Sequence, residues 1–482
     1  MEKLLDRISP KMWRIILLTG LALLVWLTVY ATLKYRINVI AALPIVAVMG
    51  LLVLYNYKLI FYLLIFCIPW SLHLELGGGL AMDIFTEPLM LVFLAVFLVE
   101  FLAGRQFSLK KKVYPFHVLI FLILFWTFFT TLTSEIFLRS FKFLLAKVWY
   151  LCTFVYIAER VITSVKDIKR IFWLFFIPMV LVSLFISIKH ATFGFSFEES
   201  NSVPNPLFVN GVIYAATLAL FTPWAFFARN WYSPKTLEWY LIHIGLFILI
   251  MGVVFAYKRG AWLAVGVLPF VYLLIKRKLF DKVIYAGLIV LFLGLTYLLT
   301  NNNYYYFAPS YRKTIFHEGD LEGHLTATFE GREISAAERF YRWVAAKNMV
   351  ADMPWVGSGP STFNKVYQGY TDDAFKTYVS DNEEESTTHN YFLMTFAEQG
   401  FIGGTLFGFL TIFMLLRGYH IYHRLRDPTH QNILMMVILG YCTILFHSLL
   451  NELIEVDKIG SMFWLSLVII HKFEVWDAET AK

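Results

Sequence analysis

Long apolar runs are the feature that most limits the folds open to this chain. A helix needs about 20 mostly apolar residues to cross a lipid bilayer, and the sequence holds 14 candidate runs of this kind. Only 16% of the residues are charged, against about 25% in soluble domains. The sequence therefore predicts an all-α integral membrane protein with about 12–14 transmembrane helices. The runs are centred near Leu24, Val46, Leu64, Leu94, Leu124, Leu151, Val180, Leu218, Leu249, Val267, Leu291, Phe407, Leu439 and Leu465.

The basic residues orient the predicted spans. Cytoplasmic loops of membrane proteins carry an excess of Lys and Arg. With the N-terminus in the cytoplasm, five basic clusters fall inside, among them Lys110–Lys112 and Lys276–Lys278. An even number of spans then returns the C-terminus to the cytoplasm, although Lys34 and Arg36, on an outside turn, go against the rule. The net charge of +7 is explained by this topology and by anionic lipids, so we expect membrane lipids and no nucleic acid as partners.

One long polar segment interrupts the apolar runs. It divides the chain into residues 1–300 with about 11 spans, an outer segment at 301–388, and residues 389–482 with about 3 spans. Within it, Glu333 to Asp352 is predicted to be a helix, because apolar and charged residues alternate and Pro354 follows the end. This large, partly helical loop between late helices is where we expect the chemistry.

Two cations lie between the ninth and tenth apolar runs, at the predicted outer membrane boundary. Charges at this depth are costly. We expect Lys258 to extend along the lipid surface to the headgroups. For Arg259, position alone allows two arrangements: the side chain extends to the headgroups in the same way, or it faces a polar cavity.

Arg339 and Arg342 lie three residues apart on the predicted outer helix and therefore share a face. Guanidinium groups bind phosphates through charge-assisted hydrogen bonds, so the pair suits a diphosphate. The alternative is local pairing, since Glu338 and Arg342 are four residues apart. We assign that alternative to Arg342 and the ligand to Arg339.

His389 and Asn390 lie where the chain re-enters apolar sequence. An imidazole here titrates near neutral pH and is able to take a proton from a hydroxyl. The alternative is a capping or interface histidine. H-E-x-x-H, P-loop and G-x-S-x-G motifs are absent from the sequence. Glu75, Asp83 and Glu87 carry carboxylates that suit a divalent cation, but their spacing matches no known metal cage. They are interpreted as surface residues, so we predict no metal and no cofactor.

Three motifs together resemble the O-antigen ligase and polymerase superfamily of bacterial membrane glycosyltransferases, which are GT-C-like. The first is Lys258-Arg259-Gly260-Ala261-Trp262. The second is Arg339-x-x-x-Trp343 running into Asp352-Met353-Pro354-Trp355-Val356-Gly357-Ser358-Gly359. The third is His389-Asn390-Tyr391-Phe392-Leu393 followed by Ala397-Glu398-Gln399-Gly400-Phe401-Ile402-Gly403. The resemblance covers roughly residues 229–417 and is specific only when the three motifs are taken together.

The resemblance implies transfer of a glycan from undecaprenyl diphosphate to an acceptor hydroxyl, at a periplasmic site on the bacterial inner membrane. It needs neither a nucleotide sugar nor a metal. His389 would be the catalytic base, with Arg259, Arg339 and Arg342 on the diphosphate. Lys258, Asn390 and Glu398 would support them.

A ligase acting on lipid A-core is the leading hypothesis. The alternatives are a polymerase that joins lipid-linked repeat units and a protein O-oligosaccharyltransferase. From a different class comes an anion or lipid transporter, with a path along Lys142, Lys147 and Arg259. No matching broken repeats, which transporters often show, are visible in the sequence.

Overall fold

The structure is a computed structural model that describes residues 56–77, 80–102, 113–308, 334–377, 380 and 386–480. The predicted spans near Leu24 and Val46 lie outside the described residues, as do residues 309–333 and 381–385 of the predicted outer segment.

The described part of the chain contains ten helices that are long and apolar enough to cross a membrane. Each coincides with a predicted span, from the one near Leu124 to the one near Leu465, which confirms an all-α multi-pass membrane protein. The spans near Leu64 and Leu94 are shorter helices, Asn56–Trp70 and α4 (Thr86–Leu102). The ten helices are α5 (Pro115–Leu132), α6 (Phe137–Leu151) continued by η3 (Cys152–Ile157) and α7 (Ala158–Val161), α8 (Val165–Ala191), α9 (Gly211–Ala228), α10 (Leu237–Phe255), α11 (Arg259–Lys276), α12 (Phe280–Leu299), α16 (Tyr391–Arg424), α17 (Pro428–Ser448) and α18 (Asp457–Thr480).

A small β-hairpin between the Asn56–Trp70 helix and α4 was not predicted. Strands β1 (Leu72–Gly77) and β2 (Leu80–Ile84) pair antiparallel, with His73 opposite Asp83. Leu72-His73-Leu74-Glu75 alternates apolar and polar residues with the period of a strand. The alternation is only a few residues long and is flanked by apolar runs, so the helical signal of the neighbouring segments hides it.

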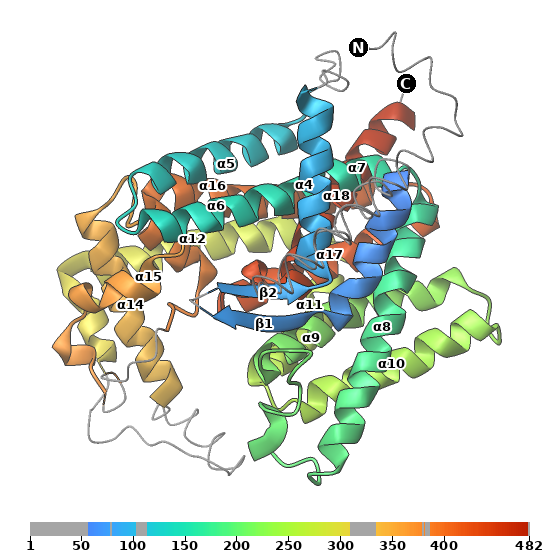
Figure 1. Cartoon of the computed structure of the whole chain (residues 1–482), viewed down its shortest axis with the longest axis horizontal. Helices are drawn as coiled ribbons and strands as arrows, with labels where there is room; N and C mark the ends of the chain where they lie inside the picture. Colours follow the sequence, from blue (N-terminus) through green and yellow to red (C-terminus); the bar gives the residue numbers. More distant parts are fainter. Residues whose placement is uncertain are drawn as a thin grey trace, which may run out of the picture.

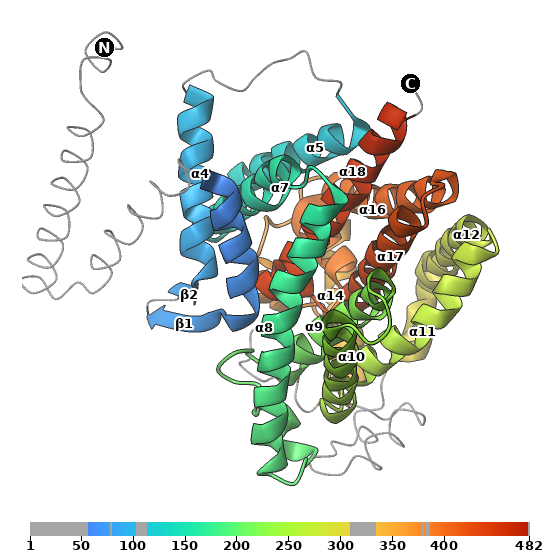
Figure 2. The same ribbon diagram turned by 90° about the vertical axis from the view of Figure 1, so that its right-hand side faces the viewer.

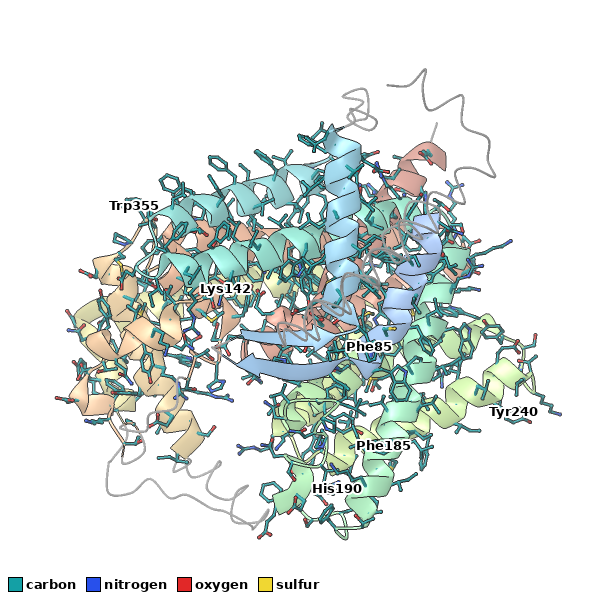
Figure 3. The ribbon with its side chains drawn as sticks, in the orientation of Figure 1. Phe85, Lys142, Phe185, His190, Tyr240 and Trp355 are labelled. Atoms are coloured by element: carbon teal, nitrogen blue, oxygen red, sulfur yellow. The ribbon has the colours of Figure 1, made fainter. Side chains whose placement is uncertain are left out.

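Helices α9 and α18 form the centre of the bundle, and 83% of the spanning window is buried in each. Helix α9 is apolar on all sides, which is typical of a buried helix, whereas α18 also buries polar side chains such as His471 and Glu474. Gly440 of α17 allows close packing on α9, because a Cβ there would lie 2.3 Å from Trp224 Nε1. By contrast, α12 has 0% of its window buried and lies at the edge of the bundle (Figure 2). Phe185 and Tyr240 likewise point outward (Figure 3), as expected for side chains that face lipid.

The outer segment is helical where the structure describes it. Helix α14 (Ile334–Asp352) ends two residues before Pro354, as the sequence predicts for this stretch. It is preceded by η6 (Thr300–Phe307) and followed by α15 (Phe363–Val366), η7 (Tyr367–Tyr370) and η8 (Asp373–Phe375). Figure 1 shows α14 and α15 together at the left of the molecule, far from the C-terminus at the upper right. The molecule therefore has two opposite ends. One carries α14 and is called the α14 end, and the other carries the C-terminus.

Candidate active site

His389 lies in a tight turn directly before α16. Its φ of 51° is in the left-handed region, which His tolerates better than bulky residues but which still costs about 1–3 kcal/mol. The turn is held on both sides of His389. Thr388 Oγ1 donates to the Asn390 carbonyl at 2.8 Å, and the Asn390 side chain caps α16 by accepting from the Leu393 N–H at 3.0 Å. Asn390 thus fixes the start of the helix that follows His389.

Glu452 braces this turn from the short connection between α17 and α18. Its Oε1 accepts from Thr388 Oγ1 at 2.9 Å and from the Asn390 N–H at 3.0 Å. Its Oε2 lies 3.8 Å from His389 Nδ1, and the neighbouring Asn451 side chain hydrogen-bonds to His389. Sequence reasoning missed both residues. The available signal was their position, in a polar connection that returns to the same predicted side as the outer segment.

Helix α14 brings its arginines to the same turn. Trp343 Nε1 donates to the Thr388 carbonyl at 2.8 Å, which fixes the helix beside His389. Burial and the positive charges of Arg342 and Arg339 lower the pKa of His389 to about 4, and the hydrogen bond to Asn451 opposes this shift. The imidazole is therefore neutral at pH 7 and able to accept a proton.

The two arginines differ in how they are held. Arg342 is 8% exposed and pairs with Glu338 at 3.4 Å, which is the local pairing expected from the sequence. Glu338 also accepts from Ser380 Oγ at 2.7 Å and from Thr377 Oγ1. Arg339 lies almost one turn earlier and is partly exposed. The geometry therefore gives Arg342 a fixed position and leaves Arg339 more accessible.

Arg259 is the first residue of α11, which begins against the end of α17. A Cβ on Gly260 would lie 3.4 Å from Leu450 Cδ1 and 3.9 Å from His447 Cε1. Leu450 directly precedes Asn451 and Glu452. The connection between α17 and α18 therefore lies between the start of α11 and the His389 turn.

Lys258 does not extend along the lipid surface as the sequence suggested. Its Cε lies 2.9 Å from the position of a Cβ on Gly211, the first residue of α9. The resulting burial lowers the pKa of the Lys258 amine. Its position between helices explains the difference, because a side chain at a helix junction is able to pack inward as readily as toward headgroups.

Helix α16 is broken at Gly400, and the break positions part of the outer segment. Gly400 has φ 67° and ψ −172°, a conformation that favours glycine. The three carbonyls before the break accept hydrogen bonds from elsewhere in the chain. The donors are the Ser358 N–H to Ala397 at 3.2 Å, the Gly359 N–H to Glu398 at 2.8 Å, and Trp126 Nε1 to Gln399 at 2.8 Å.

Glu398 anchors the same loop through its side chain. It is 3% exposed, and its oxygens accept from the Ser361 N–H at 2.8 Å and the Phe363 N–H at 2.9 Å. Both oxygens are therefore engaged by backbone, and the support that Glu398 gives is structural. The structure thus joins the second and third sequence motifs as packing partners.

A polar cavity of about 210 Å³ lies beside the α17–α18 connection. Asp83 and Glu87, expected to be surface residues, line it instead. Asp83 is on strand β2 of the unpredicted hairpin, and Glu87 is in the first turn of α4, which follows the hairpin. Asp457 and Lys458 at the start of α18 face the same space, together with aromatic Trp149, Tyr150 and Phe208. Aromatic surfaces beside hydrogen-bonding groups provide both stacking and polar contacts for a ligand.

Comparison with known proteins gives one family. Residues 244–408 match the model of the O-antigen ligase family. No curated protein has a sequence that matches this chain significantly. The matched range begins within α10 and ends within α16, so it includes Arg259, Arg339, Arg342 and His389 but not Glu452.

Proposed function

This chain belongs, through residues 244–408, to the O-antigen ligase superfamily of membrane glycosyltransferases, and from this premise we propose a specific reaction. The protein transfers a glycan from undecaprenyl diphosphate to an acceptor hydroxyl, on the periplasmic face of the bacterial inner membrane. The observation that carries the proposal is the turn that holds His389 beside Glu452 and α14, whose arginines act on the imidazole.

The reaction uses each of these groups once. The acceptor oxygen attacks the anomeric carbon, and His389 takes the hydroxyl proton, an effect worth roughly 10²–10⁴-fold. The bond from that carbon to the diphosphate oxygen breaks, and its electron pair leaves with the diphosphate. Arg339 and Arg342, with Arg259 at the start of α11, stabilise the growing negative charge. Glu452 holds the His389 turn and, at 3.8 Å from Nδ1, stabilises the imidazolium that forms.

In this proposal the arginines take the role that a divalent ion has in other glycosyl transfers, so no catalytic metal is needed. The 210 Å³ cavity lies beside the connection that carries Glu452 and suits a sugar-sized ligand, because its carboxylates are hydrogen-bonding groups for sugar hydroxyls. We propose lipid A-core as the acceptor, with a lipid-linked repeat unit or a protein as the alternatives.

The transporter hypothesis is weakened by how its cations are held. Lys147 Nζ pairs with Glu455 Oε1 at 2.7 Å and its side chain is 8% exposed. Lys142 is exposed on α6 (Figure 3). One cation is therefore neutralised and the other faces outward, so they do not line one path for an anion.

The direct test is glycan transfer by the purified protein. It is incubated with a lipid-linked repeat unit, with and without lipid A-core, and products are resolved by mass. We expect glycan attached to lipid A-core only when core is present. Chain lengthening without core would replace the ligase with a polymerase. Uptake of a labelled anion into proteoliposomes, abolished by Arg259→Ala and without any glycan transfer, would overturn the enzyme proposal.

A further inference from the structure

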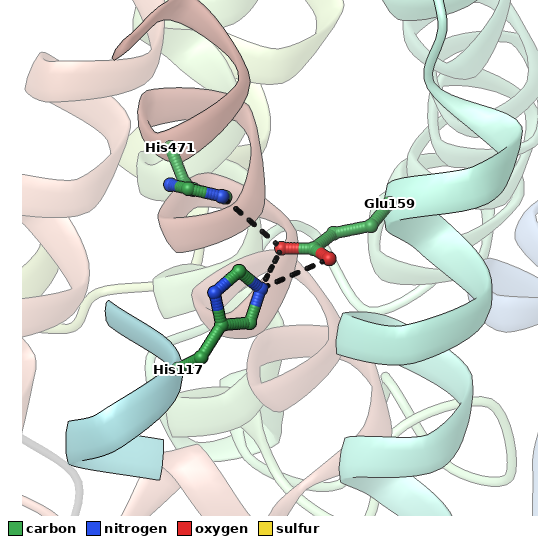
Figure 4. Close-up of side chains that lie close together, drawn as sticks. All are labelled: His117, Glu159 and His471. Atoms are coloured by element: carbon green, nitrogen blue, oxygen red, sulfur yellow. Dashed lines mark hydrogen bonds and ion pairs between the residues drawn. The ribbon is translucent and has the colours of Figure 1, made fainter. Parts of the chain in front are cut away.

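Two histidines and a glutamate meet at the end of the bundle away from α14. His117 is on the first turn of α5, Glu159 is in α7, and His471 is in the second half of α18. Figure 4 shows the two imidazoles converging on the Glu159 carboxylate. Their ligand atoms all lie within 4.8 Å of one another. His471 is fourteen residues beyond Asp457, about 21 Å along α18 from this residue of the cavity lining.

A cation shared by these three side chains requires small shifts, because some ligand atoms now stand at hydrogen-bond distance and the whole set spans up to 4.8 Å. His117 Nε2 lies 2.9 Å and 3.1 Å from the two Glu159 oxygens, and His471 Nε2 lies 3.5 Å from Oε1. In a tetrahedral zinc site with bonds of about 2.0–2.2 Å, ligand atoms stand about 3.4 Å apart. Two imidazoles and one carboxylate are also a common ligand set for zinc.

A second observation concerns the far side of the His471 ring. Its Nδ1 is buried and, among the described residues, has no partner at hydrogen-bond distance, while Glu474 Oε2 lies 3.7 Å away. A metal-ligating histidine usually directs its other ring nitrogen to a carboxylate, which fixes the ring and its tautomer. Glu474 is in turn held by Arg417. The ring is therefore oriented with Nε2 toward Glu159.

Burial separates this cluster from an ordinary surface ion pair. His471 is 3% exposed, and its ring packs between Phe116 and Tyr114 with centroids at 5.1 Å and 4.8 Å. A buried imidazole without a full set of partners is costly. In His471 the nitrogen without a partner among the described residues is Nδ1, while Nε2 faces Glu159 across 3.5 Å. The His117 and Glu159 side chains are 38% and 23% exposed. An ion is therefore able to enter, and water is able to complete its coordination.

We propose that His117, Glu159 and His471 bind one divalent transition-metal ion, zinc above all, as a structural clamp between α5, α7 and α18. The clamp is distinct from the proposed reaction. It matters for the fold because α5 also holds the break in α16, through Trp126 and through Thr127 Oγ1, which donates to Gln399 Oε1 at 3.1 Å. Fixing the far end of α5 stabilises the helix on which that contact depends.

The test measures zinc on the full-length protein, purified in detergent without a histidine tag and stripped with a chelator. Titration against a zinc indicator is expected to show one tight site per chain. His117→Gln and His471→Gln are expected to weaken binding by more than about 100-fold, and Glu474→Gln by about 10–100-fold. The matched control is His423→Gln, which changes a histidine that hydrogen-bonds to the Ile275 carbonyl and is expected to bind zinc as the unaltered chain does.

Two further measurements use the unaltered protein, so the test remains decisive if a variant does not fold. The unaltered protein loaded with Co²⁺ is expected to show the visible absorption of a four- or five-coordinate ion, and zinc is expected to raise its unfolding temperature. Absence of tight zinc binding by the unaltered protein would overturn the proposal. So would undiminished affinity in folded His471→Gln. Either result would leave a hydrogen-bonded His–Glu–His cluster and nothing more.

Discussion

The molecule places imidazoles beside carboxylates at two opposite ends, and the remaining neighbours make them different. At the α14 end, His389 has Glu452 on one side but Arg339 and Arg342 also act on it. At the far end, His117 and His471 face Glu159, and Glu474 lies behind His471. Cations near an imidazole favour its neutral, proton-accepting form. Carboxylates near two imidazoles form a ligand set for a cation.

The comparison shows that a histidine's role is decided by the groups that surround it. Both clusters connect elements that are distant in sequence. One is proposed to bind an anion and move a proton, the other to bind a cation and hold helices together. Variants at the first should change the reaction rate and leave the fold, while variants at the second should do the reverse.

Among the variants that leave His389 in place, the largest effect is expected from Arg339→Ala. Loss of a group that stabilises transition-state charge costs about 10²–10³-fold in kcat. Lys258→Ala, which removes a cation packed against α9, should reduce the rate only mildly. Initial rates of glycan transfer from the lipid-linked donor measure both. Equal losses in the two variants would mean that total positive charge, and not the position of Arg339, matters.

Glu452→Gln should follow, with a fall in kcat of up to about 10²-fold, the cost of a small misplacement of a reacting group. Because Glu452 is a positioning residue, the KM for the donor should stay nearly constant while kcat falls. Glu238→Gln is the control, since this carboxylate is in the first turn of α10 and does not belong to the proposed site. A rise in donor KM with kcat unchanged would assign Glu452 to substrate binding instead.

Removing the proposed zinc should affect stability and not rate. Chelation should lower the unfolding temperature by several degrees, because a ligand bound only to the folded state stabilises it. The rate of glycan transfer, measured well below the unfolding temperature, should change by less than about twofold, since arginines supply the catalytic charges. Loss of transfer that zinc restores would contradict the separation of the two ends.

The smallest effect expected is a shift in pH dependence. The active form of His389 is neutral, so the rate falls as pH drops below its pKa of about 4 in the free enzyme. The acid limb of kcat/KM should therefore lie near pH 4. Arg342→Gln removes a repelling charge, which raises the pKa of His389 and moves the limb to higher pH. An unmoved limb would show that Arg342 does not act on this imidazole.

The sequence was a good guide wherever the signal is local. Apolar runs identify the described helices, Pro354 marks the end of α14, and the three-residue spacing of Arg339 and Arg342 gives their shared face. Glu338 and Arg342 pair as their spacing suggests. Each of these inferences depends on residues within a few turns of one another, where helical geometry fixes the neighbours.

What the sequence did not predict depends on contacts between distant segments. Glu452 meets Asn390 across 62 positions, and the Glu159 carboxylate meets His471 across an even longer separation. No periodicity encodes such a meeting. Glu398 is similar: its motif was visible, but its role in holding the Ser361 and Phe363 amides needs the break at Gly400. The hairpin that turns Asp83 inward was hidden by its apolar flanks.

The central claim is that His389 accepts the acceptor's proton, and one comparison of rates tests it most directly. Glycan transfer is measured for purified His389→Ala beside His471→Gln, with both variants shown to be folded and inserted in the membrane. We predict a loss of roughly 10²–10⁴-fold for His389→Ala and a nearly unchanged rate for His471→Gln. A folded His389→Ala enzyme that transfers glycan at the normal rate would contradict the claim.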